Sequence, residues 1–263
     1  MTGRWIAKLS AGGYLLVALV FIYLPVVILV LFSFQDGQLP VPPFEGPSVM
    51  WYAKLFANQR LLDALGNSIL VAVASGLVAT LLGFLAAYGL SRTDLLFPGL
   101  ARFLLIAPIT VSYLIIGMGL LITFNVLGVS KSLLAVGIGH VVINLPLSFA
   151  IIFSQMSDHH KNIDAAAHDL GASDLQTMVL ISAPMMKASL FASFCLAATL
   201  SWDEFIVAFL LSRFEVTLPV IIFEMLRAGL TPEVNAAGTL VFAISMLVVL
   251  IAATALLLKR GEA

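Results

Sequence analysis

Long apolar runs separated by short polar stretches dominate the hydrophobic pattern of this chain. A helix that crosses a bilayer needs about 20 mostly apolar residues, because roughly 30 Å must be spanned at about 1.5 Å per residue. Lipid offers the backbone no hydrogen-bonding partners, and runs of this length satisfy those groups as helices rather than as barrel strands. The pattern therefore predicts an all-α integral membrane protein, with 1–263 as a single transmembrane domain. Six runs meet the length requirement, namely 14–34, 67–91, 100–124, 133–155, 188–211 and 236–258.

The composition supports this prediction. The chain is 61% hydrophobic and 10% charged, whereas soluble globular domains average about 25% charged residues. A net charge of −1 gives no indication of a nucleic-acid partner, and the hydrophobic composition makes the lipid bilayer the expected surroundings. Cys195 is the single cysteine, so it cannot form an internal disulfide and is expected to serve in packing. Small residues such as Gly83 are expected to let neighbouring helices approach closely.

The distribution of basic residues orients the chain. Six crossings put both termini on one side of the membrane, and the positive-inside rule assigns the side richer in Lys and Arg to the cytoplasm. We therefore expect both termini and the segment 156–187 to be cytoplasmic. The richer side carries Arg4, Lys8, Arg92, Arg102, Lys161, Lys187, Lys259 and Arg260, and the other side carries Lys54, Arg60, Lys131, Arg213 and Arg227.

A mostly polar stretch, 162–184, lies between the fourth and fifth runs. Asn162 is expected to cap a short helix, which Gly171 ends in the left-handed conformation. Ser173 and Gln176 stand three apart, the pattern of a capping box that starts a second helix. The stretch is thus predicted to form a helix–Gly–helix element facing the cytoplasm, and we call 162–184 the elbow.

The first helix of the elbow carries the small apolar face Ala166, Ala167 and Leu170, of the kind that inserts into a groove on another protein. An ordinary solvated connector is the alternative that the residues leave open. The chain has no G-x-x-x-x-G-K-[ST] phosphate-binding loop, so ATP-driven work would require a separate nucleotide-binding subunit, with the elbow as its docking place. The adjacent His159 and His160 lack a third ligand at metal spacing, and no metal site is predicted.

The elbow resembles a signature of the inner-membrane permease subunits of bacterial ABC importers, which reads Glu-Ala-Ala, three residues, Gly, nine residues, Ile, any residue, Leu-Pro. The spacing here is complete, but Ala165 stands where Glu is usual and Ala183 where Leu is usual. An acidic contact to the ATPase would have to come from Asp164 or Asp169. The ATPase-coupling residues that the resemblance implies are Asp164, Ala165, Ala166, Ala167, Asp169, Leu170, Gly171, Ile181 and Pro184.

Further segments are similar to the spermidine/putrescine-type subfamily, and in particular to the shorter of its two permeases. They are WYAKLF at 51–56, ALGNSILVA at 64–72, LSWDEFIV at 200–207 and TLPVIIFEMLRAGLTPEVNA at 217–236. The resemblance implies the type I importer permease fold, with a coupling-helix elbow between helices 4 and 5, in a bacterial inner membrane. It also implies a homologous second permease, two copies of a cytoplasmic ATP-binding subunit and a periplasmic solute-binding protein. ATP and Mg would then be held by the partner subunit, and this chain would carry no cofactor and no catalytic residue.

Asp203 and Glu204 lie inside the fifth apolar run, where an acid at the helix centre costs on the order of 2.5–3.5 kcal/mol. One interpretation is that one or both acids line the translocation path and meet a cationic substrate. The flanking Trp202 and Phe205 would suit an amine through cation–π attraction. The alternative is that an acid pairs with a base on the partner permease or caps a break in the helix. His140 in the fourth run is expected to be an interior hydrogen-bonding residue.

The expected function is that of a permease subunit of an ATP-driven ABC importer for a small, cationic solute such as putrescine or spermidine. Another substrate class remains open at this point: an opine, an amino-acid derivative, another amine or an iron complex. Two other classes of protein are an intramembrane enzyme that uses Asp203 and Glu204, and a passive channel. Adjacent residues on one helix diverge and do not converge on one bond as paired catalytic carboxylates must, which disfavours the enzyme.

Overall fold

A computed structural model describes residues 2–93 and 96–260, and helices account for nearly all of its regular structure. The helices in chain order are α1 (Thr2–Phe32), α2 (Met50–Ala57), α3 (Gln59–Arg92), α4 (Pro98–Ile106), η1 (Ala107–Thr110), α5 (Tyr113–Val126), α6 (Leu133–Gln155), α7 (Asp158–Asp169), α8 (Asp174–Thr177), η2 (Met178–Ser182), α9 (Ala183–Met185), α10 (Lys187–Trp202), α11 (Ile206–Leu211), α12 (Leu218–Ala228) and α13 (Pro232–Arg260). The predicted all-α class is confirmed.

Four unbroken helical stretches are long and apolar enough to cross a bilayer, namely Ala11–Phe32, Gln59–Arg92, Leu133–Gln155 and Pro232–Ile251. Two further candidates are pairs of helices that meet at a sharp bend. The pair Pro98–Thr110 and Tyr113–Val126 bends by 104°, and the pair Asp174–Met185 and Lys187–Trp202 bends by 76°. Counting each bent pair as one crossing makes six.

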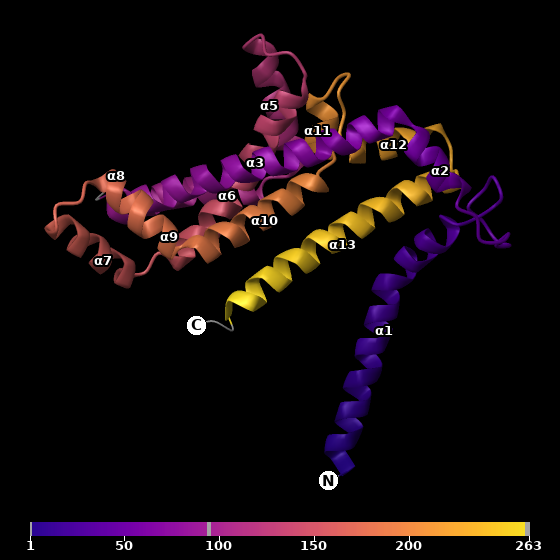
Figure 1. Cartoon of the computed structure of the whole chain (residues 1–263), viewed down its shortest axis with the longest axis horizontal. Helices are drawn as coiled ribbons and strands as arrows, with labels where there is room; N and C mark the ends of the chain where they lie inside the picture. Colours follow the sequence, from indigo (N-terminus) through magenta and orange to yellow (C-terminus); the bar gives the residue numbers. More distant parts are fainter. Residues whose placement is uncertain (1, 94–95, 261–263) are drawn as a thin grey trace. The chain divides into compact units, whose positions relative to one another are not determined.

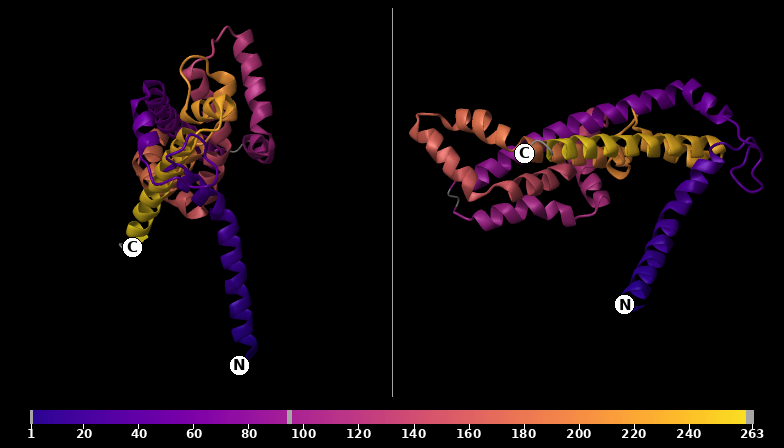
Figure 2. Two further views of the ribbon diagram at one scale, coloured as in Figure 1. Left: turned by 90° about the vertical axis from the view of Figure 1, so that its right-hand side faces the viewer. Right: turned by 60° about the horizontal axis from the view of Figure 1, so that its bottom comes forward.

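The third apolar run is therefore not the single straight helix that its length suggested. Pro108 lies in the 3₁₀ turn η1, and a proline cannot donate the backbone hydrogen bond that an α-helix interior requires. Val111 and Ser112 then adopt extended ψ angles of 135° and 137° before α5 begins. Figure 2 (left) shows α4 and α5 running in different directions on the two sides of this bend.

The chain divides into two compact units. The first comprises 1–61 and 222–246, and its loop 33–49 is closed by hydrogen bonds between its two ends. The Asp36 amide donates to the Glu45 carbonyl at 3.0 Å, and the Ser48 amide donates to the Phe34 carbonyl at 2.7 Å.

The second unit comprises 62–221 and 247–263, and α3, α6 and α10 run together through it (Figure 1). Near one end of these helices, a cluster of buried apolar side chains joins them. Its members are Phe84, Ala87, Phe149, Ile152 and Met186. Figure 1 shows the elbow helices α7, α8 and α9 at that end of the bundle and α5 and α11 towards the other.

At Gly83 the helices α3 and α6 approach each other closely. A Cβ at this position would lie 2.8 Å from the Phe149 amide nitrogen and 2.9 Å from the Ser148 Cβ. Backbone atoms cannot turn aside, so we expect Gly83→Ala to lower the unfolding free energy by about 1–3 kcal/mol, measured by thermal unfolding in detergent. Gly89→Ala in the same helix is the control, because nothing lies within 4 Å of its Cβ and Ala favours a helix by up to about 1 kcal/mol. Equal effects of the two substitutions would contradict this packing.

Candidate functional sites: the elbow and the broken fifth crossing

The first elbow helix starts earlier than predicted. α7 begins at Asp158 after Ser157, whose ψ of 167° is extended. Asn162 therefore lies inside α7 and does not cap it, which corrects the sequence-based assignment. The extended backbone at Met156 and Ser157 separates α6 from α7, and local polarity alone did not reveal this boundary.

The end of the first elbow helix agrees with the prediction. Gly171 has a φ of +88°, a region that glycine enters without the steric cost met by other residues. The Gly171 amide donates to the His168 carbonyl at 2.9 Å, and the Ala172 amide donates to the Ala167 carbonyl at 3.0 Å. These two bonds make a Schellman motif, which satisfies carbonyls at the end of α7 and turns the chain towards α8.

The second elbow helix starts with the predicted capping box. The Gln176 amide donates to the Ser173 hydroxyl oxygen at 3.3 Å, and the Ser173 amide donates to the Gln176 side-chain oxygen at 2.9 Å. After α8 the backbone continues as the π-helical turn η2 and then as α9, and α10 follows at a 76° bend. Pro184 is the second residue of α9.

The elbow presents a mixed apolar and acidic surface to solvent. Leu170 is 90% exposed, and Ala165, Ala166 and Asp169 are exposed beside it on α7. Pro184 is also exposed, and Ile181 is half-buried. A leucine that is almost fully exposed next to two small residues offers the kind of apolar contact that a partner's groove covers.

Two of the predicted coupling residues instead face inward, Asp164 (3% exposed) and Ala167 (6%). One Asp164 oxygen accepts a hydrogen bond from the Arg92 Nε at 2.7 Å, and the other accepts one from the Ser182 hydroxyl at 2.7 Å. Arg92 is the last residue of α3, and Ser182 ends η2. Sequence reasoning missed both partners, because no local pattern relates residues that lie 72 and 18 positions away from Asp164.

The fifth crossing predicted from the sequence, the run 188–211, is broken at the two acids, directly after the end of the bent pair Asp174–Met185 and Lys187–Trp202. α10 ends at Trp202 and α11 begins at Ile206, so Asp203 and Glu204 do not lie on one continuous helix as the apolar run suggested. The Glu204 carboxylate accepts hydrogen bonds from the amides of Ile206 (2.9 Å), Val207 (2.9 and 3.1 Å) and Ala208 (3.1 Å). These are the first amides of α11, which have no partner within the helix. Glu204 thus caps the break, one of the roles that the sequence left open for these acids.

A buried chain of polar side chains supports Glu204. His140 Nε2 lies 3.3 Å from a Glu204 oxygen, and His140 Nδ1 lies 2.6 Å from the Ser201 hydroxyl. Ser201 in turn accepts a hydrogen bond from Ser75 at 2.9 Å. These residues come from α6, α10 and α3, so the network joins the break to both neighbouring helices. The prediction that His140 is an interior hydrogen-bonding residue is confirmed.

The four predicted pathway residues occupy different environments. Asp203 is exposed, Phe205 is half-buried, and Trp202 and Glu204 are buried. An acid that is exposed within an apolar crossing must face water or a protein partner, because facing lipid is costly. The break therefore gives the two neighbouring acids different roles: Glu204 is a buried cap, and Asp203 is an exposed carboxylate.

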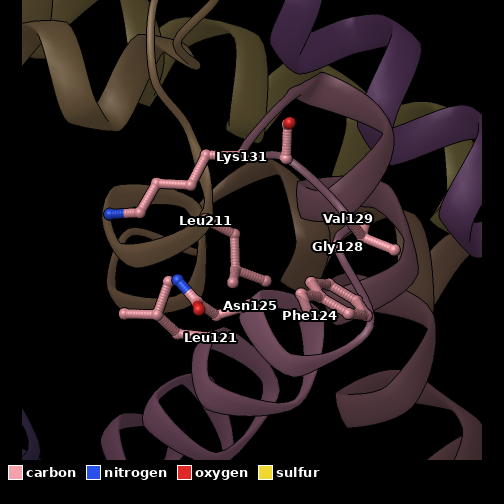
Figure 3. A pocket seen from close by; sticks show the side chains of 8 residues that line it. Leu121, Phe124, Asn125, Gly128, Val129, Lys131 and Leu211 are labelled. Atoms are coloured by element: carbon pink, nitrogen blue, oxygen red, sulfur yellow. The ribbon is translucent and has the colours of Figure 1, made fainter.

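A cavity of about 230 Å³ lies at the turn between α5 and α6. Figure 3 shows Leu121, Phe124 and Asn125 of α5 and Leu211, the last residue of α11, among its walls. Lys131, the only charged residue among those that line it, contributes the basic group. The Ser132 amide donates to the Leu211 carbonyl at 3.1 Å, so this turn is fastened to the end of the broken crossing.

The helical fold is similar to that of solved ABC importer chains. No family model matches the chain. A crystal structure of a bacterial ABC transporter that imports the acidic polysaccharide alginate contains a chain with a TM-score of 0.71 and 16% identity, covering 97% of this chain and 96% of that one. The alginate transporter in complex with its pentasaccharide-bound periplasmic protein gives a TM-score of 0.73 at 14% identity, with coverage of 94% and 92%. At such identities these structures establish the fold alone.

Relatives found by sequence similarity identify the family more narrowly than the solved structures do. The putrescine transport system permease protein PotI of Escherichia coli K12 is 31% identical over 236 residues, which are 86% of this chain and 83% of PotI. The spermidine/putrescine permease PotC is 28% identical in Escherichia coli K12, covering 93% of both chains. In Haemophilus influenzae PotC is 29% identical, with coverage of 91% and 93%. The chain belongs to the polyamine-type family of ABC importer permeases, and it is a membrane-spanning transport subunit.

Proposed function

We propose that this permease carries a polyamine such as putrescine or spermidine into the bacterial cytoplasm across the inner membrane, driven by ATP. The observation that carries the proposal is the 31% sequence identity to PotI, which extends over 86% of the chain. The exposed carboxylate of Asp203 within an apolar crossing adds physical support, because a polyamine is a multiply charged cation. Both termini and the elbow lie in the cytoplasm in this proposal, as the excess of basic residues on that side favours.

The complete importer needs further subunits. A homologous second permease forms the other half of the path, two copies of a cytoplasmic subunit bind ATP and Mg, and a periplasmic solute-binding protein delivers the substrate. The exposed Ala166, Asp169 and Leu170 of the elbow make it the docking element for the ATP-binding subunit. Closure of the two ATP-binding subunits displaces the elbow, and the helix bundles swing between outward and inward access as rigid bodies.

Asp203 is the side chain that we assign to the substrate. Its carboxylate attracts an ammonium group, and Phe205, which is half-buried beside it, offers an aromatic edge or face. The Glu204 carboxylate accepts hydrogen bonds from three backbone amides. Its role is to stabilise the helix break, which leaves Asp203 exposed. This division of roles also weighs against the intramembrane enzyme, because one acid is buried and the other exposed, and a pair of catalytic carboxylates must reach the same bond.

The proposed function is tested by uptake into proteoliposomes that contain the assembled importer. Radiolabelled putrescine or spermidine is expected to accumulate only with ATP inside and binding protein outside. Uptake that persists without ATP would indicate a passive channel. Accumulation of an opine, an amino-acid derivative or an iron complex, with neither polyamine, would keep the importer and change its substrate.

Asp203→Asn tests the substrate contact in the same assay. The substitution keeps the side-chain shape and removes the charge, so we expect polyamine uptake at limiting substrate to fall by about tenfold, the equivalent of about 1.4 kcal/mol. Asp36→Asn, the same change at an exposed acid of the loop 33–49, is the control and is expected to leave uptake unchanged. Normal uptake by Asp203→Asn would remove the cation contact from this residue.

A further inference from the structure

The buried carboxylate of Asp164 bonds to two segments that are distant from it in the chain. Arg92 at the end of α3 donates from Nε at 2.7 Å, and Ser182 at the end of η2 donates its hydroxyl at 2.7 Å. The guanidinium also lies over the Tyr88 ring, with its Cζ 5.4 Å from the ring centroid, and its Nη1 donates to the Ser91 hydroxyl at 3.2 Å. Asp164 thus connects α7, η2 and α3 at a single point.

The carboxylate is buried at this point, and its guanidinium partner is mostly buried. The Asp164 side chain is 4% exposed and that of Arg92 is 16% exposed. A buried ion pair adds little net stability compared with apolar packing, but loss of one partner leaves a buried charge without compensation. Such a pair therefore specifies one arrangement of its elements more strongly than it stabilises the protein.

We propose that Arg92, Asp164 and Ser182 form a latch that makes the elbow and α3 one moving part. Asp164 is a positioning residue, and any acidic contact with the ATP-binding subunit belongs to the exposed Asp169 instead. Both arms of the elbow are fastened, α7 through Asp164 and η2 through Ser182. A displacement of the elbow is thereby passed to α3, a 34-residue helix that contacts α6 at Gly83.

The latch rests on the proposed function, since it transmits motion that the ATP-binding subunit generates. The latch predicts that binding of the ATP-binding subunit and transport per ATP are affected differently by one substitution, which a docking role for Asp164 does not predict. In Asp164→Asn the exposed face of α7 is unchanged, so the ATP-binding subunit is expected to bind with unaltered affinity and to hydrolyse ATP. Transport per ATP hydrolysed is expected to fall by about tenfold, within the range of about 5–150-fold typical of coupling between sites.

The experiment compares the wild-type importer, Arg92→Gln, Asp164→Asn, the double variant Arg92→Gln/Asp164→Asn and the control Asp36→Asn in proteoliposomes. Subunit affinity, ATP hydrolysis and polyamine uptake are measured on the same preparations. Either single variant can fold less well because it leaves one charge or polar group unpaired. The double variant removes both charges, so it is expected to fold normally and yet to remain uncoupled to the same extent as the single variants.

Three outcomes overturn the latch: normal transport per ATP in the double variant, additive losses in the double variant, or weakened binding of the ATP-binding subunit by Asp164→Asn with normal coupling. The last would make Asp164 a docking residue. Failure of the proposed function is recognised separately, because then the wild-type complex itself shows no ATP-dependent polyamine uptake.

Discussion

Glu204→Leu is expected to be the most destabilising single substitution in the fifth crossing. The side chains have similar size, but leucine removes the carboxylate that accepts the amides of Ile206, Val207 and Ala208. Loss of a helix cap costs about 0.5–2 kcal/mol, and each buried donor without a partner costs about 1–3 kcal/mol. We therefore expect the unfolding free energy to fall by at least about 2 kcal/mol, measured by thermal unfolding in detergent, and polyamine transport to be lost.

Glu204→Gln and Asp203→Asn separate capping from substrate binding. Glutamine keeps a carbonyl oxygen that can accept an amide of α11, so we expect a smaller loss of stability and retention of most transport. Asp203→Asn changes an exposed group and is expected to leave stability unchanged while it lowers uptake. The reverse pattern, in which Glu204→Gln lowers polyamine uptake at full stability, would place Glu204 in the translocation path.

Gly171→Val is expected to uncouple the importer by deforming the elbow. Gly171 has a φ of +88°, and a side chain in the left-handed region costs about 1–2 kcal/mol, with more for a β-branched residue. The substitution would abolish the turn that brings the Gly171 and Ala172 amides back to α7. We expect the ATP-binding subunit to co-purify poorly and ATP-dependent uptake to fall by at least about tenfold.

Gly171→Asn is the matched control, because asparagine enters the left-handed region more easily than other residues. Nothing lies within 4 Å of a Cβ at this position, so the chain itself has room for either side chain. Ala166→Glu tests the docking face directly: it changes an exposed helical position, leaves the fold intact and is expected to prevent co-purification. Full uptake and coupled ATP hydrolysis in both Gly171→Val and Ala166→Glu would exclude docking through the elbow.

The elbow shows which local features were readable before the structure. The left-handed Gly171 and the capping box of Ser173 and Gln176 involve residues within five positions of one another, so their hydrogen bonds follow from local spacing. The start of α7 was less readable, because Ser157, the residue that precedes the helix, makes no side-chain capping hydrogen bond, and the path of the chain out of α6 sets the boundary there rather than at Asn162.

The two acids of the fifth run show the limit of such reasoning. Hydropathy placed Asp203 and Glu204 inside a crossing and made both candidates for the path. Their separation depends on the break after Trp202, on the three amides of α11 and on His140 from a different helix, none of which leaves a periodic signal in the sequence.

The sequence by itself determined the helical membrane class, the apolar runs and the motif spacing of the elbow, because hydrophobic length, caps and glycine conformation act over one or a few turns. Only the tertiary structure decided that Asp164 is fastened to Arg92 and Ser182, that Glu204 caps a break and that Asp203 faces outward. These assignments depend on contacts between α3, α6, α7 and α10. Such contacts arise from the packing of whole helices, which is decided by complementary surfaces far apart in the chain.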